Sequence, residues 1–185
     1  GYTPGAAVRS LPNEDEKYTI KLDWDINEDH RANYTYNYND GFNWAESDSD
    51  DNEYEFTDHF YERGAELKSH TGALFSNWTE QFSTEVRVSA LDLENRQISR
   101  AGGEIGEVQI RTLNDDDGDG QFSSATVYMG TDDSRHTNYL NYEALNFKLA
   151  GNYALGDHLL TAGYEQDDLD VFNLFIQETR GEYRF

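Results

Sequence analysis

Cysteine is absent from the 185-residue sequence, which excludes disulfide frameworks, thiolate metal sites and cysteine nucleophiles. Cationic residues are scarce, because 14 Lys and Arg stand against 37 Asp and Glu and leave a formal charge of -23. A chain this acidic repels nucleic-acid phosphates, so nucleic acid is not expected as a partner. The same charge favours cationic partners, and calcium bound by carboxylates is the first candidate.

Long apolar runs are also absent, since none approaches the ~18 residues that a membrane-spanning helix requires. Residues 1–4 lack the features of a signal peptide and resemble mid-chain sequence, as expected for a piece of a longer protein. The mean hydropathy of -0.89 is compatible with a membrane barrel, whose strands alternate lipid-facing apolar residues with lumen-facing polar residues. Aromatic residues make up 14% of the chain, which favours strands and membrane-interface girdles over a disordered acidic tail.

Alternation of apolar and polar residues with a period of two predicts three β-hairpins. In the first strand, Tyr18, Ile20 and Leu22 point to one face, whereas Thr19 and Lys21 point to the other. Each hairpin closes through a short segment of turn-forming residues. The predicted hairpins and their turns are residues 18–38 with 27–29, residues 65–90 with 77–80, and residues 145–164 with 156–157.

Long acidic segments connect these hairpins. Residues 39–58 contain no Lys or Arg and are predicted to form a solvated loop without a core of its own. Residues 92–123 form a second acidic loop, which a predicted short strand at residues 108–112 interrupts. The aromatic-rich residues 171–185 are predicted to begin a further strand.

Short turns at one end of the hairpins and long loops at the other are typical of outer-membrane barrels, although a soluble sandwich can show the same alternation. The sequence therefore predicts an all-β fold of antiparallel up-and-down strands. These strands would form part of a transmembrane β-barrel, about six to eight strands of a larger one. Nine polar residues are predicted to face its lumen: Thr19, Lys21, Asp23, Asn33, Asn37, Glu85, Arg87, Lys148 and Asn152.

Several phrases of the sequence resemble the barrel region of TonB-dependent receptors, which are transporters of the bacterial outer membrane. The phrases at residues 21–27 and 29–31 resemble the strand, turn and strand that open many of these barrels, and the phrases from residue 130 onward are similar to later segments of the family. Together they extend over most of the chain. The phrases are KLDWDIN at residues 21–27, DHR at 29–31, GTDDSRHTN at 130–138, GDH at 156–158 and DVFNLF at 170–175.

The resemblance implies a 22-stranded barrel around a plug domain. Such a receptor imports siderophores, cobalamin, carbohydrates or peptides with energy relayed from the inner membrane. This chain shows neither a plug domain nor a TonB box, so residues 1–185 are expected to be a single segment of barrel wall. The implied partners are the remaining barrel strands, the plug domain, a TonB-type energy-coupling protein acting through that plug, outer-membrane lipid, and a small-molecule or peptide substrate.

Catalytic motifs are not found, because the chain has no G-x-S-x-G elbow, phosphate-binding glycine loop or H-E-x-x-H helix. The many acids make any carboxylate pair unspecific as a glycosidase signal. The chain is therefore predicted not to be an enzyme.

No pair of its five histidines has the close spacing of a common metal site, and all five are predicted to lie in turns or loops: His30, His59, His70, His136 and His158.

One short segment has the spacing of a calcium loop. Asp115, Asp117 and Asp119 fit its first half, in which alternate carboxylates converge on one cation, but Thr126 replaces the Glu expected at the twelfth position. Either a loose calcium site or a solvated acidic turn accounts for these residues. This segment also keeps open a second hypothesis, a secreted soluble β-sheet module that binds calcium or carbohydrate.

Overall fold

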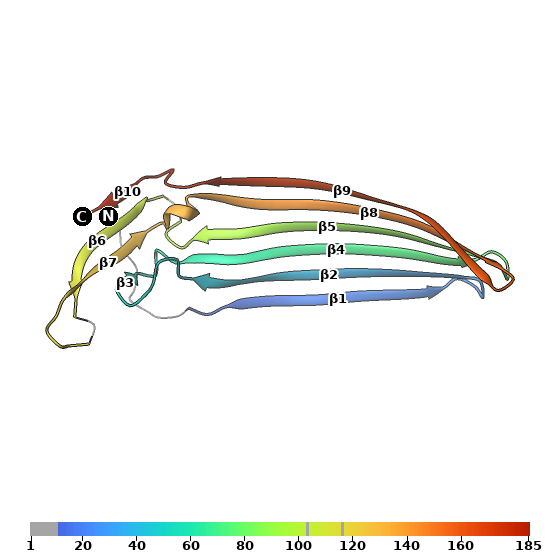
Figure 1. The fold of residues 1–185 in the computed structure, drawn as a ribbon, viewed down its shortest axis with the longest axis horizontal. Helices are drawn as coiled ribbons and strands as arrows, with labels where there is room; N and C mark the ends of the chain where they lie inside the picture. Colours follow the sequence, from blue (N-terminus) through green and yellow to red (C-terminus); the bar gives the residue numbers. More distant parts are fainter. Residues whose placement is uncertain (1–10, 103, 116) are drawn as a thin grey trace.

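The computed structural model describes residues 11–102, 104–115 and 117–185, so the prediction about residues 1–4 lies outside the described part. The described residues form two β-sheets and one short 3₁₀-helix, η1 (Asp133–Arg135). A sheet of six long strands makes up most of the molecule, and a sheet of four short strands lies at one end of it (Figure 1). Within these ranges, no helix is long and apolar enough to cross a membrane.

The long sheet has an up-and-down topology, because each strand pairs antiparallel with the next long strand of the chain. This arrangement confirms the predicted antiparallel all-β fold. The three predicted hairpins are also confirmed as neighbouring pairs within the sheet. In sheet order, the strands are β1 (Glu14–Asp25), β2 (His30–Ala45), β4 (Tyr61–Asn77), β5 (Phe82–Ser99), β8 (Thr137–Leu155) and β9 (His158–Ile176).

The three hairpin turns lie together at the end of the long sheet opposite the short strands (Figure 1). In the first turn, Asn27 Oδ1 accepts hydrogen bonds of 2.9 Å from the backbone amides of Asp29 and His30. In the second turn, Thr79 Oγ1 accepts the backbone amide of Phe82 at 3.0 Å. The third turn uses Gly156 at a φ of 59°, a left-handed conformation that glycine adopts without steric cost. Local turn chemistry therefore sets the register of all three hairpins.

The short sheet is assembled from the segments that connect the long strands at the opposite end. Its outer pairs, β10 with β6 and β3 with β7, are parallel, whereas β6 and β7 form an antiparallel hairpin. We call this sheet, together with the turns around it, the cap. Its strands are β3 (Glu53–Glu55), β6 (Glu107–Asn114), β7 (Ser123–Gly130) and β10 (Glu182–Arg184).

The acidic connections contain more strand than the sequence predicts. The prediction of a loop over residues 39–58 is wrong for residues 39–45, which continue β2, and for residues 53–55, which form β3. The prediction over residues 92–123 is wrong for residues 92–99, which continue β5. Both extensions pair with β4, although their charged residues conceal the apolar alternation. The predicted strand at residues 108–112 is confirmed as part of β6.

The last predicted strand is also corrected. Residues 171–176 do not begin a new element, because they complete β9, which runs without interruption from His158. The strand that follows is the short β10, and it joins the cap instead of the long sheet. The aromatic residues of β9 obscured this boundary because their alternation changes phase within the strand.

Buried side chains gather where the cap meets the long sheet, and the apolar ones there are Phe60, Tyr61, Ala125 and Tyr128. The other buried apolar residue, Ala73, lies farther along β4. The strands β1 and β9 are exposed along their whole length. Large apolar side chains of the long sheet are uncovered, including Trp24, which is 65% exposed. Within the described residues, the long sheet therefore has two free edges and no core of its own.

A valine at the third turn tests how far that turn controls stability. We expect Gly156→Val to destabilise the hairpin by about 1–2 kcal/mol, because a β-branched residue is strained at positive φ. Gly72→Val is the matched control, since a Cβ at either glycine would have open space around it and Gly72 lies in the extended strand β4. Urea unfolding of the refolded protein measures the loss of stability in both variants. An equal loss in Gly156→Val and Gly72→Val would contradict a left-handed turn at Gly156.

Candidate functional site

All nine residues predicted to face a lumen lie on one face of the long sheet. The register shows this directly, because residues paired across antiparallel strands point to the same side. One hydrogen-bonded row passes from Asp23 to Asn33, then through Ala73 to Arg87 and Lys148. The other five residues lie an even number of positions from members of this row and share their face. We call this side of the sheet the polar face.

Cross-strand contacts tie the polar face together. Thr19 Oγ1 donates to Asn37 Oδ1 at 2.8 Å, between β1 and β2. Glu85 accepts from two cations, with its Oε1 2.8 Å from Arg87 Nη2 and its Oε2 3.4 Å from Lys148 Nζ. Asn152 Oδ1 accepts from Thr161 Oγ1 at 2.7 Å, between β8 and β9. These side chains are paired across the strands, so the face can line an aqueous space without losing its order.

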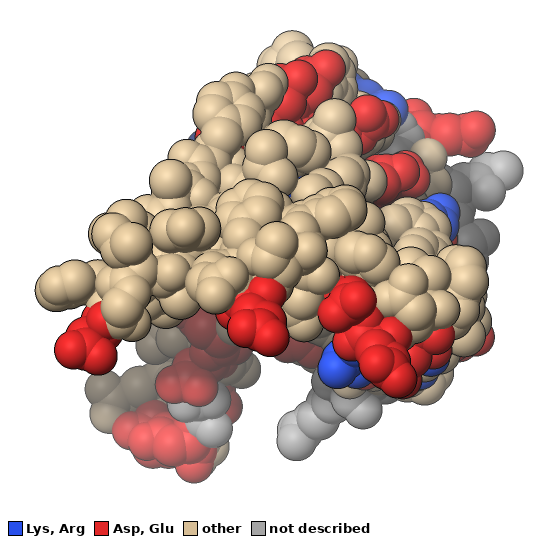
Figure 2. All heavy atoms as spheres, turned by 90° about the vertical axis from the view of Figure 1, so that its right-hand side faces the viewer, with Lys and Arg blue, Asp and Glu red and all other residues tan. Residues whose placement is uncertain are grey.

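The opposite side, which we call the apolar face, is uncharged toward the hairpin turns. Its rows there contain large side chains such as Leu22, Leu74, Val86 and Leu149. Seen from the turn end, uncharged residues make a broad surface, and acidic side chains lie along its lower border and at its upper right (Figure 2). The two faces of the turn-proximal half thus differ sharply in polarity.

The predicted calcium loop connects β6 to β7. The structure brings Asp115, Asp117 and Asp119 together, with one carboxylate oxygen of each within 4.8 Å of the others. These carboxylates also accept backbone amides of their own loop, for example Asp115 Oδ2 from Gly120 at 3.1 Å. Asp117 and Asp119 are exposed to solvent. Calcium binding by this loop stays a prediction, because the loop's own hydrogen bonds account equally well for its shape.

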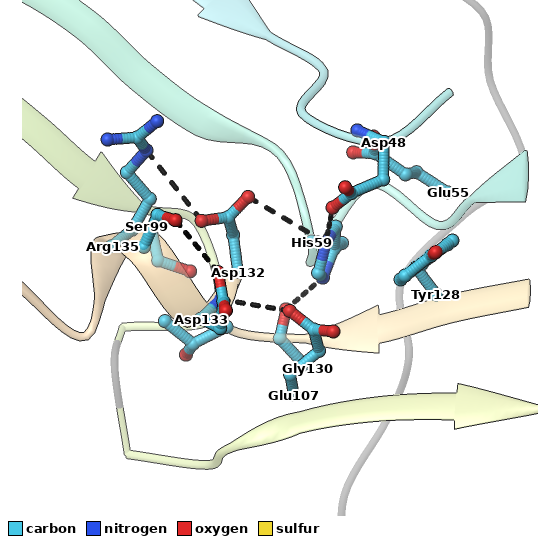
Figure 3. A network of polar contacts seen from close by, with 12 residues as sticks. Asp48, Glu55, His59, Ser99, Glu107, Tyr128, Gly130, Asp132, Asp133 and Arg135 are labelled. Atoms are coloured by element: carbon cyan, nitrogen blue, oxygen red, sulfur yellow. Dashed lines mark hydrogen bonds and ion pairs between the residues drawn. The ribbon is translucent and has the colours of Figure 1, made fainter. Parts of the chain in front are cut away.

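A second cluster lies inside the cap and was not predicted. His59 is 0% exposed and Asp132 is 1% exposed, and Asp48 lies above them with its side chain 37% exposed. Asp48 belongs to the connection between β2 and β3, His59 to the connection between β3 and β4, and Asp132 to the turn between β7 and η1. Figure 3 shows both carboxylates directed at the imidazole.

The tautomer of His59 follows from its contacts. Its Nδ1 lies 3.2 Å from the carbonyl oxygen of Gly130, which can only accept, so Nδ1 carries a proton. Its Nε2 is left facing Asp48 Oδ2 at 3.1 Å and Asp132 Oδ2 at 4.0 Å. Gly130 can present its carbonyl here because it turns at a φ of 82°, and a Cβ would come within 2.2 Å of Gly106 O. The imidazole is thus fixed with Nε2 between two carboxylates.

Further acids surround this pair. Glu55 and Glu107 are 2% and 3% exposed, and Asp58 is 6% exposed. Burial raises the pKa of all three carboxyls, although Asp58 accepts the Gly130 amide and Glu107 accepts the Asp133 amide. Burial opposes the charge of His59, but the carboxylates of Asp48, Glu55 and Asp132 outweigh it and raise the pKa of the imidazole. The cluster thus places five carboxyl groups around one histidine.

One cation of the chain approaches the cluster from the side. Arg135 Nε lies 3.8 Å from Asp132 Oδ1, and the guanidinium is stacked 4.1 Å from the centre of the Tyr61 ring. The stacking holds the charge over the ring instead of within hydrogen-bonding distance of the carboxylate. Arg135 therefore neutralises Asp132 only partly.

Spacing rules missed the cluster because its members are distant in sequence, as the 71 positions between His59 and Gly130 show. The prediction that every histidine lies in a turn or loop is wrong for His70, which is within β4. His136 does lie in a loop, but it is buried, and its Nε2 lies 3.1 Å from the carbonyl oxygen of Thr131, a contact that the prediction did not include. His30 and His158 do lie at hairpin turns, where each begins a strand.

No protein-family model, curated protein or solved structure matches the chain. The resemblance to TonB-dependent receptors therefore depends on the sequence phrases and on the strand pattern. Function is accordingly inferred from the two faces of the long sheet and from the buried cluster of the cap.

The raised pKa values predict an unusual pH dependence of cap stability in the presence of chelator. A raised pKa in the folded state contributes stability while the group is protonated, and this contribution is lost as pH rises through that pKa. We therefore expect the cap to withstand more urea at about pH 5.5 than at about pH 8. The fluorescence of Trp44, at the cap end of β2, reports this unfolding when Trp24 and Trp78 are replaced by Phe.

The variant Glu107→Gln provides the control, because it fixes a neutral side chain at a buried position. We expect it to raise stability at about pH 8 and to reduce the difference between the two pH values. A cap that becomes more stable as pH rises would show that its carboxylates are stabilised in their charged form.

Proposed function

We propose that the chain is a section of the barrel wall of a bacterial outer-membrane transporter of the TonB-dependent receptor type. The observation that carries this proposal is the shape of the apolar region on the apolar face. It is a band that crosses the strands obliquely and ends abruptly in charged residues. Its slant and its height both correspond to those of a bilayer crossed by tilted strands.

The slant follows from the register at the border of the band that lies farther from the turns. The row that contains Tyr18 and Tyr38 continues through Lys68, Asp92 and Glu143 to Asp170 on β9. The row is thus aromatic at β1 and β2 but charged from β4 onward. On β9, the last apolar residue of the band is Tyr164, six positions nearer the turn because 170 − 164 = 6.

These six residues convert into an angle. They correspond to about 20 Å along the strands, at ~3.3 Å per residue, while the five spacings from β1 to β9 cover about 24 Å at ~4.8 Å each. The border of the band is therefore inclined by about 40° to the hydrogen-bonded rows. Strands of outer-membrane barrels are tilted by roughly 35–45° from the barrel axis, so a bilayer would cross them at this angle.

The height of the band agrees with the same geometry. On β5 it extends over residues 82–90 and on β8 over residues 145–153, nine residues in each case because 90 − 82 + 1 = 9. Nine residues cover about 30 Å along a strand, or about 23 Å along a membrane normal at a tilt of ~40°. The apolar band of outer-membrane barrels is about 25 Å tall.

Beyond the band, the two faces exchange their character on β5, whereas on β9 Phe172 and Leu174 keep the outward face apolar near the cap. The apolar face becomes charged at Asp92 and Glu94 on β5, while Leu91 and Leu93 take the apolar positions on the opposite side. A soluble sandwich would keep one face apolar along the whole strand, because that face packs against the second sheet. A barrel strand that extends past the bilayer has its outer surface in water, which explains why the outward residues turn polar there.

The remaining parts of the proposal follow from this orientation. The polar face lines the lumen, and the hairpin turns lie on the periplasmic side with the cap outside the cell. The free edges of β1 and β9 pair with further barrel strands, since an unpaired edge is not tolerated in lipid. Import of a siderophore, cobalamin, carbohydrate or peptide would use energy relayed through a plug domain, and the wall itself performs no catalysis.

Lysine substitutions at one depth test the proposed orientation. Leu149 lies at the centre of the band on β8, so Leu149→Lys should cost roughly 2–4 kcal/mol on refolding into lipid vesicles. Ala150→Lys and Asn152→Lys on the polar face should cost little, and the lysine at position 150 would lie opposite Glu85. Equal costs at positions 149 and 150 would overturn the assignment of the faces.

A hydrodynamic measurement tests the need for partners. The chain has a mass of 21.3 kDa, and we expect it to require detergent, lipid or further strands to remain dispersed. Light scattering coupled to size-exclusion chromatography measures its state without detergent. A monodisperse monomer of that mass would favour the soluble β-sheet module instead.

A further inference from the structure

Three carboxylate oxygens of the buried cluster have no hydrogen-bond partner. They are Glu55 Oε2, Asp58 Oδ1 and Asp132 Oδ1, each with less than 1 Å² of exposed surface. Glu55 is 2% exposed and reaches from β3 toward Asp48, whose backbone amide its other oxygen accepts (Figure 3). Unpaired carboxylate oxygens are costly inside a protein, and an ion is one of the few groups that satisfies them.

We propose that Asp48, His59 and Asp132 form a binding site for one divalent transition-metal ion of the Zn²⁺ or Mn²⁺ class, with Glu55 available as a further ligand. This site is distinct from the Asp115 loop, which lies beyond β6 and β7. It does not depend on the proposed transport function, because the cluster has the same geometry whether or not the long sheet lies in a membrane.

The distances from His59 Nε2 to the two carboxylates fit a shared ion without rearrangement of the backbone. Two ligand atoms about 2.1 Å from one ion lie about 3.0 Å apart at a right angle, about 3.4 Å at the tetrahedral angle and about 4.2 Å when opposed. His59 Nε2 lies 3.1 Å from Asp48 Oδ2 and 4.0 Å from Asp132 Oδ2. All three ligand atoms lie within 4.8 Å of one another.

The surroundings of His59 are those of a metal ligand. A ligating histidine commonly donates its second ring N–H to a carbonyl, which fixes the ring and directs the other lone pair at the ion. The contact from Nδ1 to Gly130 O performs this role at 3.2 Å. The partly exposed Asp48 forms the mouth of the site, so an ion can enter from solvent before it meets the buried His59 and Asp132.

The ligand types select the class of ion. Calcium and magnesium prefer sites made only of oxygen, whereas imidazole suits zinc and other transition metals. Carboxylates with one imidazole, and no thiolate, favour Zn²⁺ or Mn²⁺ over soft ions such as Cu⁺. The alternative occupant is a proton on Nε2 shared with Asp48, but Asp132 Oδ2 lies 4.0 Å from Nε2 and is too far away to share that proton.

An ion at this position would connect three chain segments that belong to different parts of the sequence. Asp48 belongs to the acidic connection after β2, His59 immediately precedes β4, and Asp132 follows β7. Binding would therefore hold the acidic connection against the cap and the long sheet. This explains why residues with so many charges adopt a defined arrangement above the ends of the long strands.

Calorimetric titration with Zn²⁺ tests the site in the chelator-treated full-length protein. We expect one ion per chain, and a loss of affinity of about tenfold or more in His59→Ala and Asp132→Asn. His158→Ala and Asp117→Asn are the matched controls, because they remove an exposed histidine and a carboxylate of the other acidic group. Calcium in excess should not displace the bound Zn²⁺.

Two further measurements keep the test decisive if the buried variants fail to fold. Asp48→Ala changes a partly exposed side chain and leaves the backbone amide that Glu55 accepts, and it should also weaken binding by about tenfold. Co²⁺ in place of Zn²⁺ should give absorption bands that Asp48→Ala alters. The proposal is overturned if the wild-type protein binds no stoichiometric Zn²⁺, if Asp48→Ala binds it unchanged, or if Asp117→Asn alone abolishes binding.

Discussion

The continuous register of backbone hydrogen bonds from β1 to β9 is the constraint on which the rest of the structure depends. With the register fixed, the face of every side chain follows from whether its position is odd or even, and a slip of one residue would exchange the faces of that strand. The three tight turns fix this register locally. Together with the pairing of β2 with β4 and of β5 with β8, they keep Asp23, Asn33 and Lys148 in one row and leave the apolar residues on the other side of the sheet.

The opposite ends of the long strands pose a different physical problem. There the chain is acidic, so the cap is ordered by polar contacts around His59 and by the short sheet, in addition to the buried side chains of Phe60, Tyr61 and Tyr128. Buried carboxylates stabilise a fold only when their charge is compensated. A cation shared by Asp48, His59 and Asp132 would supply that compensation, and it would make the order of the cap depend on metal supply as well as on its few buried apolar side chains.

Much of the long sheet could be predicted from the sequence because one face of each turn-proximal strand is apolar. Alternation located all three hairpins and placed the nine polar residues, from Thr19 to Asn152, on one side. The same rule failed at residues 39–45 and 92–99, where polar residues occupy positions that backbone pairing and ion pairs such as Arg96 with Asp40 hold in the sheet. It could not find the His59 cluster, because tertiary structure brings those ligands together across strands and turns that no local spacing records.

The orientation of β8 is the most direct test of the central claim, that the apolar face lies against lipid. The chain has no cysteine of its own, so single cysteines at residues 145–153 can carry spin labels without interference. In lipid vesicles, we expect oxygen accessibility to be high at odd positions and greatest near residue 149, and accessibility to a water-soluble nickel reagent to be high at even positions. Uniform accessibility along the strand, or the reverse alternation, would contradict the account.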